Sequence, residues 1–356
     1  MTTRPRCWPR TQVRAKHPGN LRIVVGTIIP LLATTLAFGA DTHPRPVRIL
    51  TLDQAANLLG LDPEDVRTPG SARATRRTPH RVPTRSRERM AAKVARFRDT
   101  FGERATVLRT RHYVILTTLG AEWAELIGPE MDAMFGEYQK RLGFGKRISE
   151  RFIIRVYGDQ GEYLASGGEP GYGGHFSPHS GEIVAFLDDA SALRPALYHE
   201  GVHQFVHFHV RHAPVWFNEG LARYYESAMP DPDAGPTDAP RFIVGRALLA
   251  SSAHLKRELG YDGLVPLAHL LRMKPAEFYQ VDTSLHYAQA WAFTHFLLES
   301  GDAARRKLWD DYFRALRDGL SQEAANLRIF DRVDMTELEQ DFKDYVRDLD
   351  GWIETK

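Results

Sequence analysis

The feature that most constrains this 356-residue chain is a pair of histidines four residues apart, His199-Glu200-Gly201-Val202-His203. On an α-helix, residues four apart differ by about 40° in direction and about 6 Å in height, so both imidazoles project from one face towards a common point. Neutral imidazole is a good Zn²⁺ ligand, and a catalytic zinc takes three protein ligands and keeps one open position. The pair therefore predicts a metal site on a helix, with one more donor elsewhere in the chain.

Glu219 is the expected third donor. We expect one helix over residues 192–210 and a second over 215–227, which begins after Pro214 and carries Glu219. A glutamate usually lies on a solvated helix face, but this one stands within an apolar run that reads as a buried helix. Glu200 points about 100° from its histidine neighbour, which suits a carboxylate that takes a proton from water at the metal. We interpret His199, His203 and Glu219 as Zn²⁺ ligands and Glu200 as the general base.

His199-Glu200-x-x-His203 and Trp216-Phe217-Asn218-Glu219-Gly220-Leu221-Ala222 together resemble the gluzincin metallopeptidases, the thermolysin-like group whose third zinc ligand is a glutamate on the next helix. The closer likeness is to exported bacterial proteins classed with the peptidases of that clan. It runs from about residue 111 to 227 and is specific only at the metal. The resemblance implies an α+β fold of two lobes. The first is a zincin-like catalytic lobe that consists of a small mixed sheet and the zinc helix, and the second is an all-helical C-terminal lobe. It also implies a peptide or protein substrate.

His209 offers an alternative third ligand, because it follows His199 at the metzincin spacing of ten residues. That pattern needs a glycine that lets the chain leave the helix, and Val206 stands there instead, a stiff residue that disfavours positive φ. If the helix continues, His209 lies about 80° and 15 Å from His199, too far to share a metal. His207 continues the histidine row and is expected beside the ligands or on the surface.

The chain divides into four expected regions: a signal peptide over 1–40, an N-terminal region over 41–103, a catalytic lobe over 104–228 and a helical lobe over 229–356. Hydrophobic periodicity predicts strands over 113–118, 152–157 and 182–187, and a helix over 121–142. In the second lobe it predicts helices over 242–259, 265–273, 284–300, 303–319 and 335–352. Residues 172–177, which are rich in glycine, are expected either to border the substrate, as the resemblance suggests, or to form a simple hairpin.

Gluzincin chemistry also implies a donor from the second lobe, commonly Tyr or His, that stabilises the oxyanion formed during hydrolysis. His286 and Tyr287 open an expected helix in that lobe and are the main candidates. Tyr261, Tyr279 and the 171–178 segment are the weaker ones. For each tyrosine taken singly, packing in the core is the alternative role.

The N-terminus predicts export, because basic residues precede an apolar run from Ile23 to Phe38. Small residues favour cleavage near Gly39, and an uncleaved anchor is the alternative. The only cysteine, Cys7, would be lost on cleavage. Residues 71–98 hold ten Lys or Arg and one acidic residue, which predicts a disordered linker that could contact the cell envelope.

The sequence therefore predicts an exported zinc-dependent metallopeptidase. One alternative from another class is a non-catalytic binder of cell-envelope polymer that keeps the same fold. Residues 50–67 also resemble the first half of a helix-turn-helix DNA reader, but an exported protein meets little DNA, so a short amphipathic helix is the preferred interpretation and no nucleic-acid partner is expected. The net charge of +2 does not indicate a partner.

Overall fold

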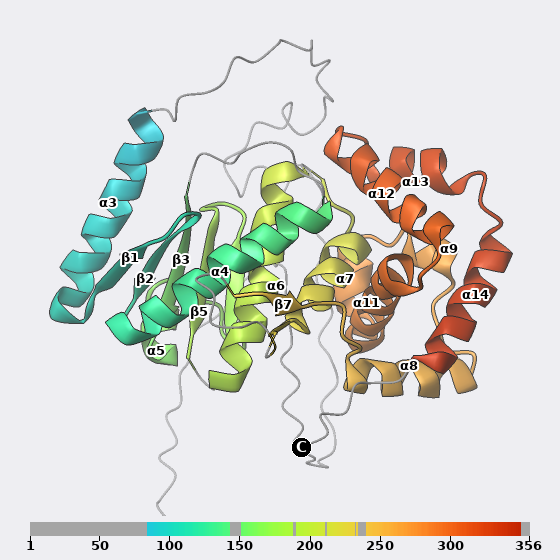
Figure 1. Ribbon diagram of the computed structural model, residues 1–356, viewed down its shortest axis with the longest axis horizontal. Coiled ribbons are helices and arrows are strands. Elements are labelled where there is room, and N and C mark those ends of the chain that lie inside the picture. Colours follow the sequence, from blue (N-terminus) through green and yellow to red (C-terminus); the bar gives the residue numbers. More distant parts are fainter. Residues whose placement is uncertain are drawn as a thin grey trace, which may run out of the picture.

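The computed structural model describes residues 84–142, 151–187, 190–210, 212–231, 233 and 240–349. Over these residues the protein is a mixed α+β structure with a small mixed sheet and many helices (Figure 1). The sequence expectations for residues 1–83, which are the signal peptide, the 50–67 helix and the start of the linker, lie outside the described residues. In chain order the elements are α3 (Thr84–Phe101), the 3₁₀ turn η1 (Gly102–Arg104), β1 (Thr106–Arg109), β2 (Tyr113–Thr117), α4 (Ala121–Leu142), β3 (Phe152–Tyr157), α5 (Gln160–Ala165), β4 (Gly174–Ser177), β5 (Glu182–Phe186), α6 (Ala190–His209), α7 (Val215–Glu226), β6 (Met229–Pro230), β7 (Phe242–Ile243), α8 (Leu249–Gly260), α9 (Leu267–Leu270), α10 (Pro275–Gln280), α11 (Thr283–Glu299), α12 (Ala303–Arg317), α13 (Gln322–Phe330) and α14 (Met335–Asp348).

The main sheet has five strands in the order β1-β2-β3-β5-β4. Its three central strands run parallel, with Ile115 of β2 opposite Ile154 of β3, and Ile154 opposite Ile183 of β5. The edge strands β1 and β4 are antiparallel to their neighbours. Central parallel strands are apolar on both faces because both faces are covered, which explains why β2 and β5 are buried along their whole length.

Helices cover both faces of this sheet. The side chains of Tyr113 and Ile115 belong to the apolar cluster that α4 and α6 complete, whereas Val114 and Leu116 belong to a second cluster with α3. The alternation follows from the two-residue period of a strand. In Figure 1, α3 lies across the sheet from α4 and α6. The zinc helix predicted from the sequence, α6, is thus one of the helices that pack on the sheet.

The prediction of a disordered linker is wrong for residues 84–98, because α3 occupies them. Met90, Val94, Phe97 and Phe101 recur every three or four residues, and they pack on the sheet in the second apolar cluster. Lys93 of α3 also pairs with the buried Glu182 of β5. The segment was predicted to be disordered because of its high positive charge. The basic side chains occupy the other faces of the helix, so the apolar stripe is narrow and does not dominate the composition.

Helices α8 to α14 pack against the sheet-containing part mainly through α11, which lies beside α7. Every residue of α11 from Leu285 to Leu297 is buried, so this helix is the centre of the C-terminal half. The apolar cluster that begins under the sheet at Ile115 continues to Val346 of α14. The two parts therefore share one hydrophobic core over the described residues.

The sequence predicts an entirely helical C-terminal half, and this prediction is wrong at its start. Phe242 and Ile243, predicted to begin a helix, form β7, which pairs with β6, and the helix begins only at Leu249. Gly245 has a φ of 73°, a left-handed conformation that breaks a helix. Helices α10 and α13 were not predicted, and the predicted 335–352 helix ends at Asp348.

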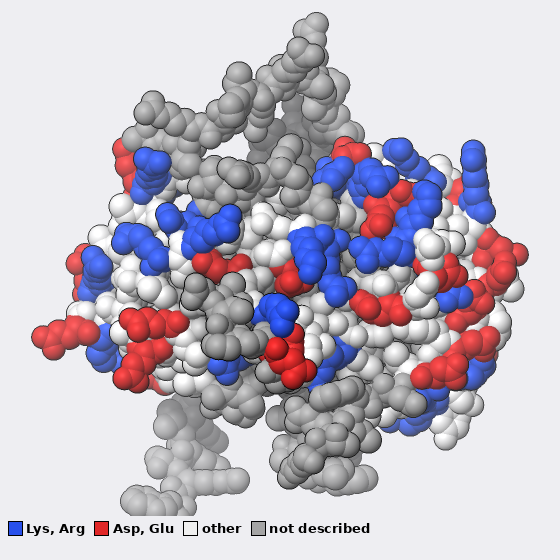
Figure 2. Space-filling view, viewed as in Figure 1, with Lys and Arg blue, Asp and Glu red and all other residues white. Residues whose placement is uncertain are grey.

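Charged side chains of both signs are interspersed over the surface seen in Figure 2. Many form pairs one turn apart, such as Arg306 with Asp310 and Lys307 with Asp311 on α12. This agrees with the near balance of 47 basic and 45 acidic residues in the sequence. None of the helices in the described part has the length and apolar character needed to cross a bilayer.

Candidate metal centre

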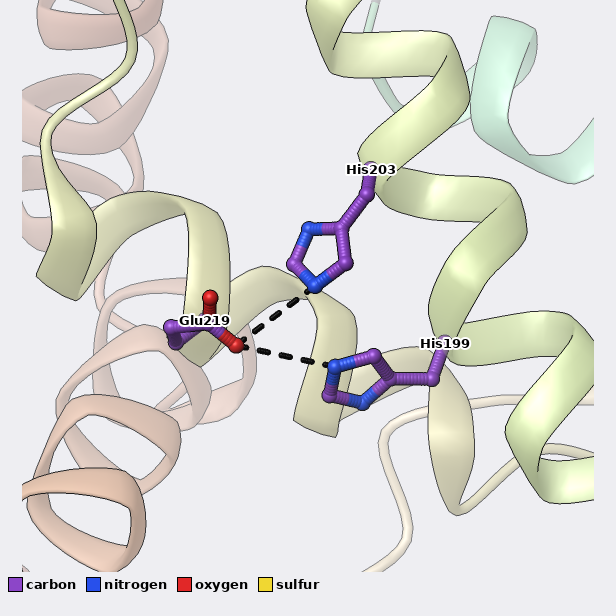
Figure 3. A group of neighbouring side chains, drawn as sticks. All are labelled: His199, His203 and Glu219. Atoms are coloured by element: carbon purple, nitrogen blue, oxygen red, sulfur yellow. Dashed lines mark ion pairs between the residues drawn. The ribbon is translucent and has the colours of Figure 1, made fainter. Parts of the chain in front are cut away.

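Three side chains predicted to share a metal lie together at the junction of α6 and α7. His199 and His203 project from one face of α6, and Glu219 approaches them from α7 (Figure 3). Glu219 Oε2 is 3.6 Å from His199 Nε2 and 3.5 Å from His203 Nε2, and one ligand atom from each residue lies within 4.8 Å of the others. All three side chains are buried. The structure therefore contains a compact, buried His₂Glu group that could hold a metal ion.

The three atoms that face one another all lack a hydrogen-bond partner among the described residues. His199 Nε2, His203 Nε2 and Glu219 Oε2 are all fully buried and form no hydrogen bond in the described structure. Leaving a buried polar group unsatisfied costs about 1–3 kcal/mol, so three such atoms at one point need an explanation. A cation bound between them would satisfy all three. The donor set of two imidazoles and a carboxylate thus fits a metal ion.

The electrostatics of the group also favour a positive charge at this point. Burial lowers the pKa of His199, but Glu219 and Glu226 outweigh that effect and raise it to about 9. Burial raises the pKa of Glu219, but His203 and His199 outweigh it and hold that pKa well below its usual value. The carboxylate is therefore ionised, as a ligand must be, and a metal ion would take the place of the histidine proton.

His199 is oriented by a residue that the sequence reasoning missed. Its Nδ1 lies 2.9 Å from Glu226 Oε2, and the other oxygen of Glu226 accepts a hydrogen bond from Arg223 Nη1 at 2.6 Å. A carboxylate on the far nitrogen of a histidine ligand fixes the ring and directs the other nitrogen to the metal. The signal was present in the spacing, because Glu226 follows Glu219 by seven residues, two turns of α7, on the same face.

Glycines follow both functional glutamates, and each allows a close helix contact. A Cβ on Gly220 would lie 2.4 Å from the carbonyl oxygen of Ala290 on α11, and a Cβ on Gly201 would lie 2.8 Å from Tyr138 Oη on α4. Only a residue without a side chain fits at such distances. The two glycines therefore allow α7 to pack closely on α11 and α6 to pack closely on α4.

Glu200, the predicted base, is buried next to the metal group and contacts the edge of the sheet. Its Oε2 accepts a hydrogen bond from the backbone N–H of Phe176 at 2.7 Å. Phe176 belongs to β4, whose other edge pairs with β5. The glycine-rich segment is thus one strand of a hairpin, as one of the two expectations had it, and it lies beside the predicted base. That it borders a substrate stays a prediction.

The candidate oxyanion donors occupy different places. Tyr287 is buried, and its pKa is raised well above 10 by burial, with further contributions from Glu219, Tyr279 and Glu200. Its phenol is therefore protonated. His286, its neighbour on α11, directs Nδ1 to the carbonyl oxygen of Phe278 at 2.9 Å.

The remaining candidates are divided between the site and the surface. Tyr279 Oη donates a hydrogen bond to Glu219 Oε1 at 2.7 Å, whereas Tyr261 is 81% exposed at the end of α8. His209 is not a member of the metal-binding group, and its ring packs against Phe205. Because α6 continues through Val206 to His209, as the missing glycine predicted, the helix carries His209 away from the ligands. His207 is exposed.

The fold and this site define an α+β protein with a buried His₂Glu group suited to a metal ion. Residues 195–312 are similar to a family described as a protein of unknown function (DUF1570). That region begins within α6 and ends within α12, so it includes the three candidate ligands, Glu200, Glu226, Tyr279 and Tyr287. No curated protein matches the chain.

Proposed function

We propose that this protein is an exported zinc-dependent metallopeptidase of the gluzincin type, with a zincin-like catalytic lobe. The observation that carries the proposal is the convergence of three buried, unpartnered donor atoms with a buried glutamate directly after the first histidine. A structural zinc has four protein ligands, whereas three protein ligands and an adjacent base are typical of a catalytic site. Export rests on the basic and apolar N-terminal segments alone.

Zinc is the metal that best fits these donors. In a tetrahedral site with bonds of about 2.0–2.1 Å, two ligand atoms lie about 3.3–3.4 Å apart. The separations of 3.5 and 3.6 Å between Glu219 Oε2 and the two imidazole nitrogens are close to that value. Ca²⁺ and Mg²⁺ prefer oxygen ligands, so two imidazoles argue against them.

In the proposed mechanism the residues of the chain hold the ion, move the proton and stabilise the developing charge. Zinc, held by His199, His203 and Glu219, would supply Lewis-acid polarisation of the scissile carbonyl and of the attacking water. Glu200 takes the proton of that water and passes it to the leaving amine. Tyr287, which stays protonated, donates a hydrogen bond to the oxyanion, and His286 is the alternative donor.

The edge strand β4 supplies a means of aligning a peptide. Among the described residues β4 pairs with β5 on one side only, and on its other side the Phe176 N–H donates a hydrogen bond to Glu200. An extended peptide could pair with the groups of this edge that neither β5 nor Glu200 uses. A peptide bound in this way is held through its main chain, so most of its side chains do not affect binding. The substrate class proposed here is therefore an extended polypeptide bound beside β4.

Digestion of a proteome-derived peptide library tests this function. The zinc-loaded protein is expected to cleave peptide bonds, to lose this activity when a chelator removes the metal, and to recover it when zinc is added back. Cleavage that persists after metal removal would contradict the proposal. The cleaved sequences would also define the specificity.

A further inference from the structure

We propose that Tyr279 is a positioning residue that determines how Glu219 binds the metal, an inference that rests on the proposed metal function. The two oxygens of this carboxylate have different surroundings. Oε1 accepts the hydrogen bond of the Tyr279 phenol at 2.7 Å, whereas Oε2 faces His199 and His203 and has no hydrogen-bond partner. The phenol thus engages one oxygen and leaves the other for the ion.

This division matters because a carboxylate can bind a metal through one oxygen or through both. Two-oxygen binding would occupy a second coordination position, yet a catalytic zinc needs that position for water and substrate. Glu219 is fully buried, so bulk water does not compete for Oε1 and the phenol contact is strong. Tyr279 therefore favours a single Glu219–metal bond and keeps the fourth position open.

The chain holds Tyr279 in place through contacts between α10 and α11. Helix α10 has only six residues, but His286 Nδ1 contacts the carbonyl oxygen of Phe278, and Thr283 Oγ1 donates to the carbonyl oxygen of Tyr279 at 3.2 Å. Between the two helices, Asp282 adopts a left-handed backbone with a φ of 40°. Such a conformation is uncommon in a non-glycine residue, although Asp adopts it more readily than most. These contacts, together with the turn at Asp282, hold the phenol against Glu219.

Tyr287 provides a matched comparison, because it belongs to the same aromatic group but has a different proposed task. The Tyr279 and Tyr287 rings are 6.3 Å apart, and both contact Phe278. Removing either phenol oxygen makes a similar small change in the same surroundings. Loss of the Tyr279 oxygen should alter the metal site, whereas loss of the Tyr287 oxygen should alter turnover.

The test compares Tyr279→Phe with Tyr287→Phe in the full mature protein, with circular dichroism and melting in chelator as controls for folding. Zinc affinity is measured by competition with a chromophoric chelator, and Co²⁺ replaces zinc for visible absorption spectroscopy. We expect Tyr279→Phe to bind zinc about 10–100-fold more weakly, the usual effect of losing a group that orients a ligand. Its Co²⁺ d–d absorption should weaken as Glu219 binds through both oxygens and the coordination number rises. Tyr287→Phe should keep both properties of the wild type.

Three results would overturn the inference. Unchanged zinc affinity and an unchanged Co²⁺ spectrum in Tyr279→Phe would exclude a positioning role. If kcat fell in that variant while both metal properties stayed unchanged, Tyr279 would instead be the oxyanion donor. Equal losses of affinity in both variants would show a general effect of the aromatic group. A wild-type protein that binds neither metal would refute the proposed function as well, whereas a wild type that binds metal but cleaves nothing leaves the test of Tyr279 intact.

Discussion

At the scale of single residues, the two buried glutamates next to the histidines differ in their partners. Glu219 faces two imidazoles and a phenol, while Glu200 accepts a hydrogen bond from the backbone N–H of Phe176. A carboxylate among cationic or donor groups is a good ligand, and one that borders the proposed substrate strand can exchange protons with the reacting groups. The different neighbours of the two glutamates are therefore the basis on which we propose Glu219 as a ligand and Glu200 as a base.

Removal of any one ligand should release the metal. We expect His199→Ala, His203→Ala and Glu219→Ala to retain far less zinc than the wild type, which should hold about one ion per chain, because two donors do not complete a catalytic shell. Metal analysis after dialysis measures this, with His209→Ala as the matched control. Stoichiometric zinc in Glu219→Ala together with zinc loss in His209→Ala would mean that the metzincin-like alternative is right.

Removal of the oxyanion donor should slow turnover and leave the metal in place. Tyr287→Phe is expected to lower kcat by about 10²–10³ with little change in KM, because the hydrogen bond forms mainly in the transition state. His286→Ala is measured in parallel as the alternative donor. If both variants turn over peptides like the wild type, neither residue is the donor.

At the scale of helices and strands, regular periodicity predicted the elements that carry the site. Residues 121–142 and 152–157 form α4 and β3 with the expected bounds, and α6 and α7 differ from expectation by one or two residues at their ends. Helix α3 was missed because charge dominated its composition, and α10 because six residues show no helical period. Tyr279 lies on α10, sixty residues from Glu219, so their contact depends on tertiary packing that no local pattern encodes.

The α7–α11 contact at Gly220 should be sensitive to a single methyl group. Gly220→Ala is expected to destabilise the fold by about 1–3 kcal/mol, because the new Cβ would overlap the Ala290 carbonyl and force the helices apart. Urea unfolding measures the change. Gly136→Ala on α4 is the matched control, since nothing lies within 4 Å of its Cβ, and it should be neutral or stabilising by up to about 1 kcal/mol. A Gly220→Ala protein as stable as the control would show that the helices are not in tight contact.

At the scale of the whole molecule, α6 of the sheet-containing part carries the histidines and Glu200. The C-terminal helices α10 and α11 contact Glu219 and its helix α7. The single apolar cluster from Ile115 to Val346 means that the metal centre lies within one continuous core. The sequence predicted the members of this metal-binding group because two histidines one turn apart project from the same face of a helix. Two long-range features of the site could not be predicted in this way. The contact of Tyr279 with Glu219 and the contact of Gly220 with α11 both depend on how the two halves of the protein pack together.

Export is a prediction at the same scale. The mature protein should lie outside the cytoplasm and begin near Ala40 or Asp41, because the N-terminal segment has the charge and apolar pattern of a secretory signal. N-terminal peptide mapping of the purified protein decides this. A chain that starts at Met1 and fractionates with membranes would indicate an anchor, and recovery from the cytosol would contradict export.

Glu200→Gln is the sharpest test of the proposal that the buried metal group catalyses peptide hydrolysis. The amide has the shape of the carboxylate but cannot accept the proton of the attacking water. With zinc content and melting temperature measured alongside, peptide hydrolysis is followed for the wild type and the variant. We expect full zinc occupancy and a retained fold in the variant, with hydrolysis lower by several orders of magnitude. Equal turnover by the two proteins would contradict the proposal, and a wild type that binds zinc but cleaves no peptide would favour the non-catalytic binder.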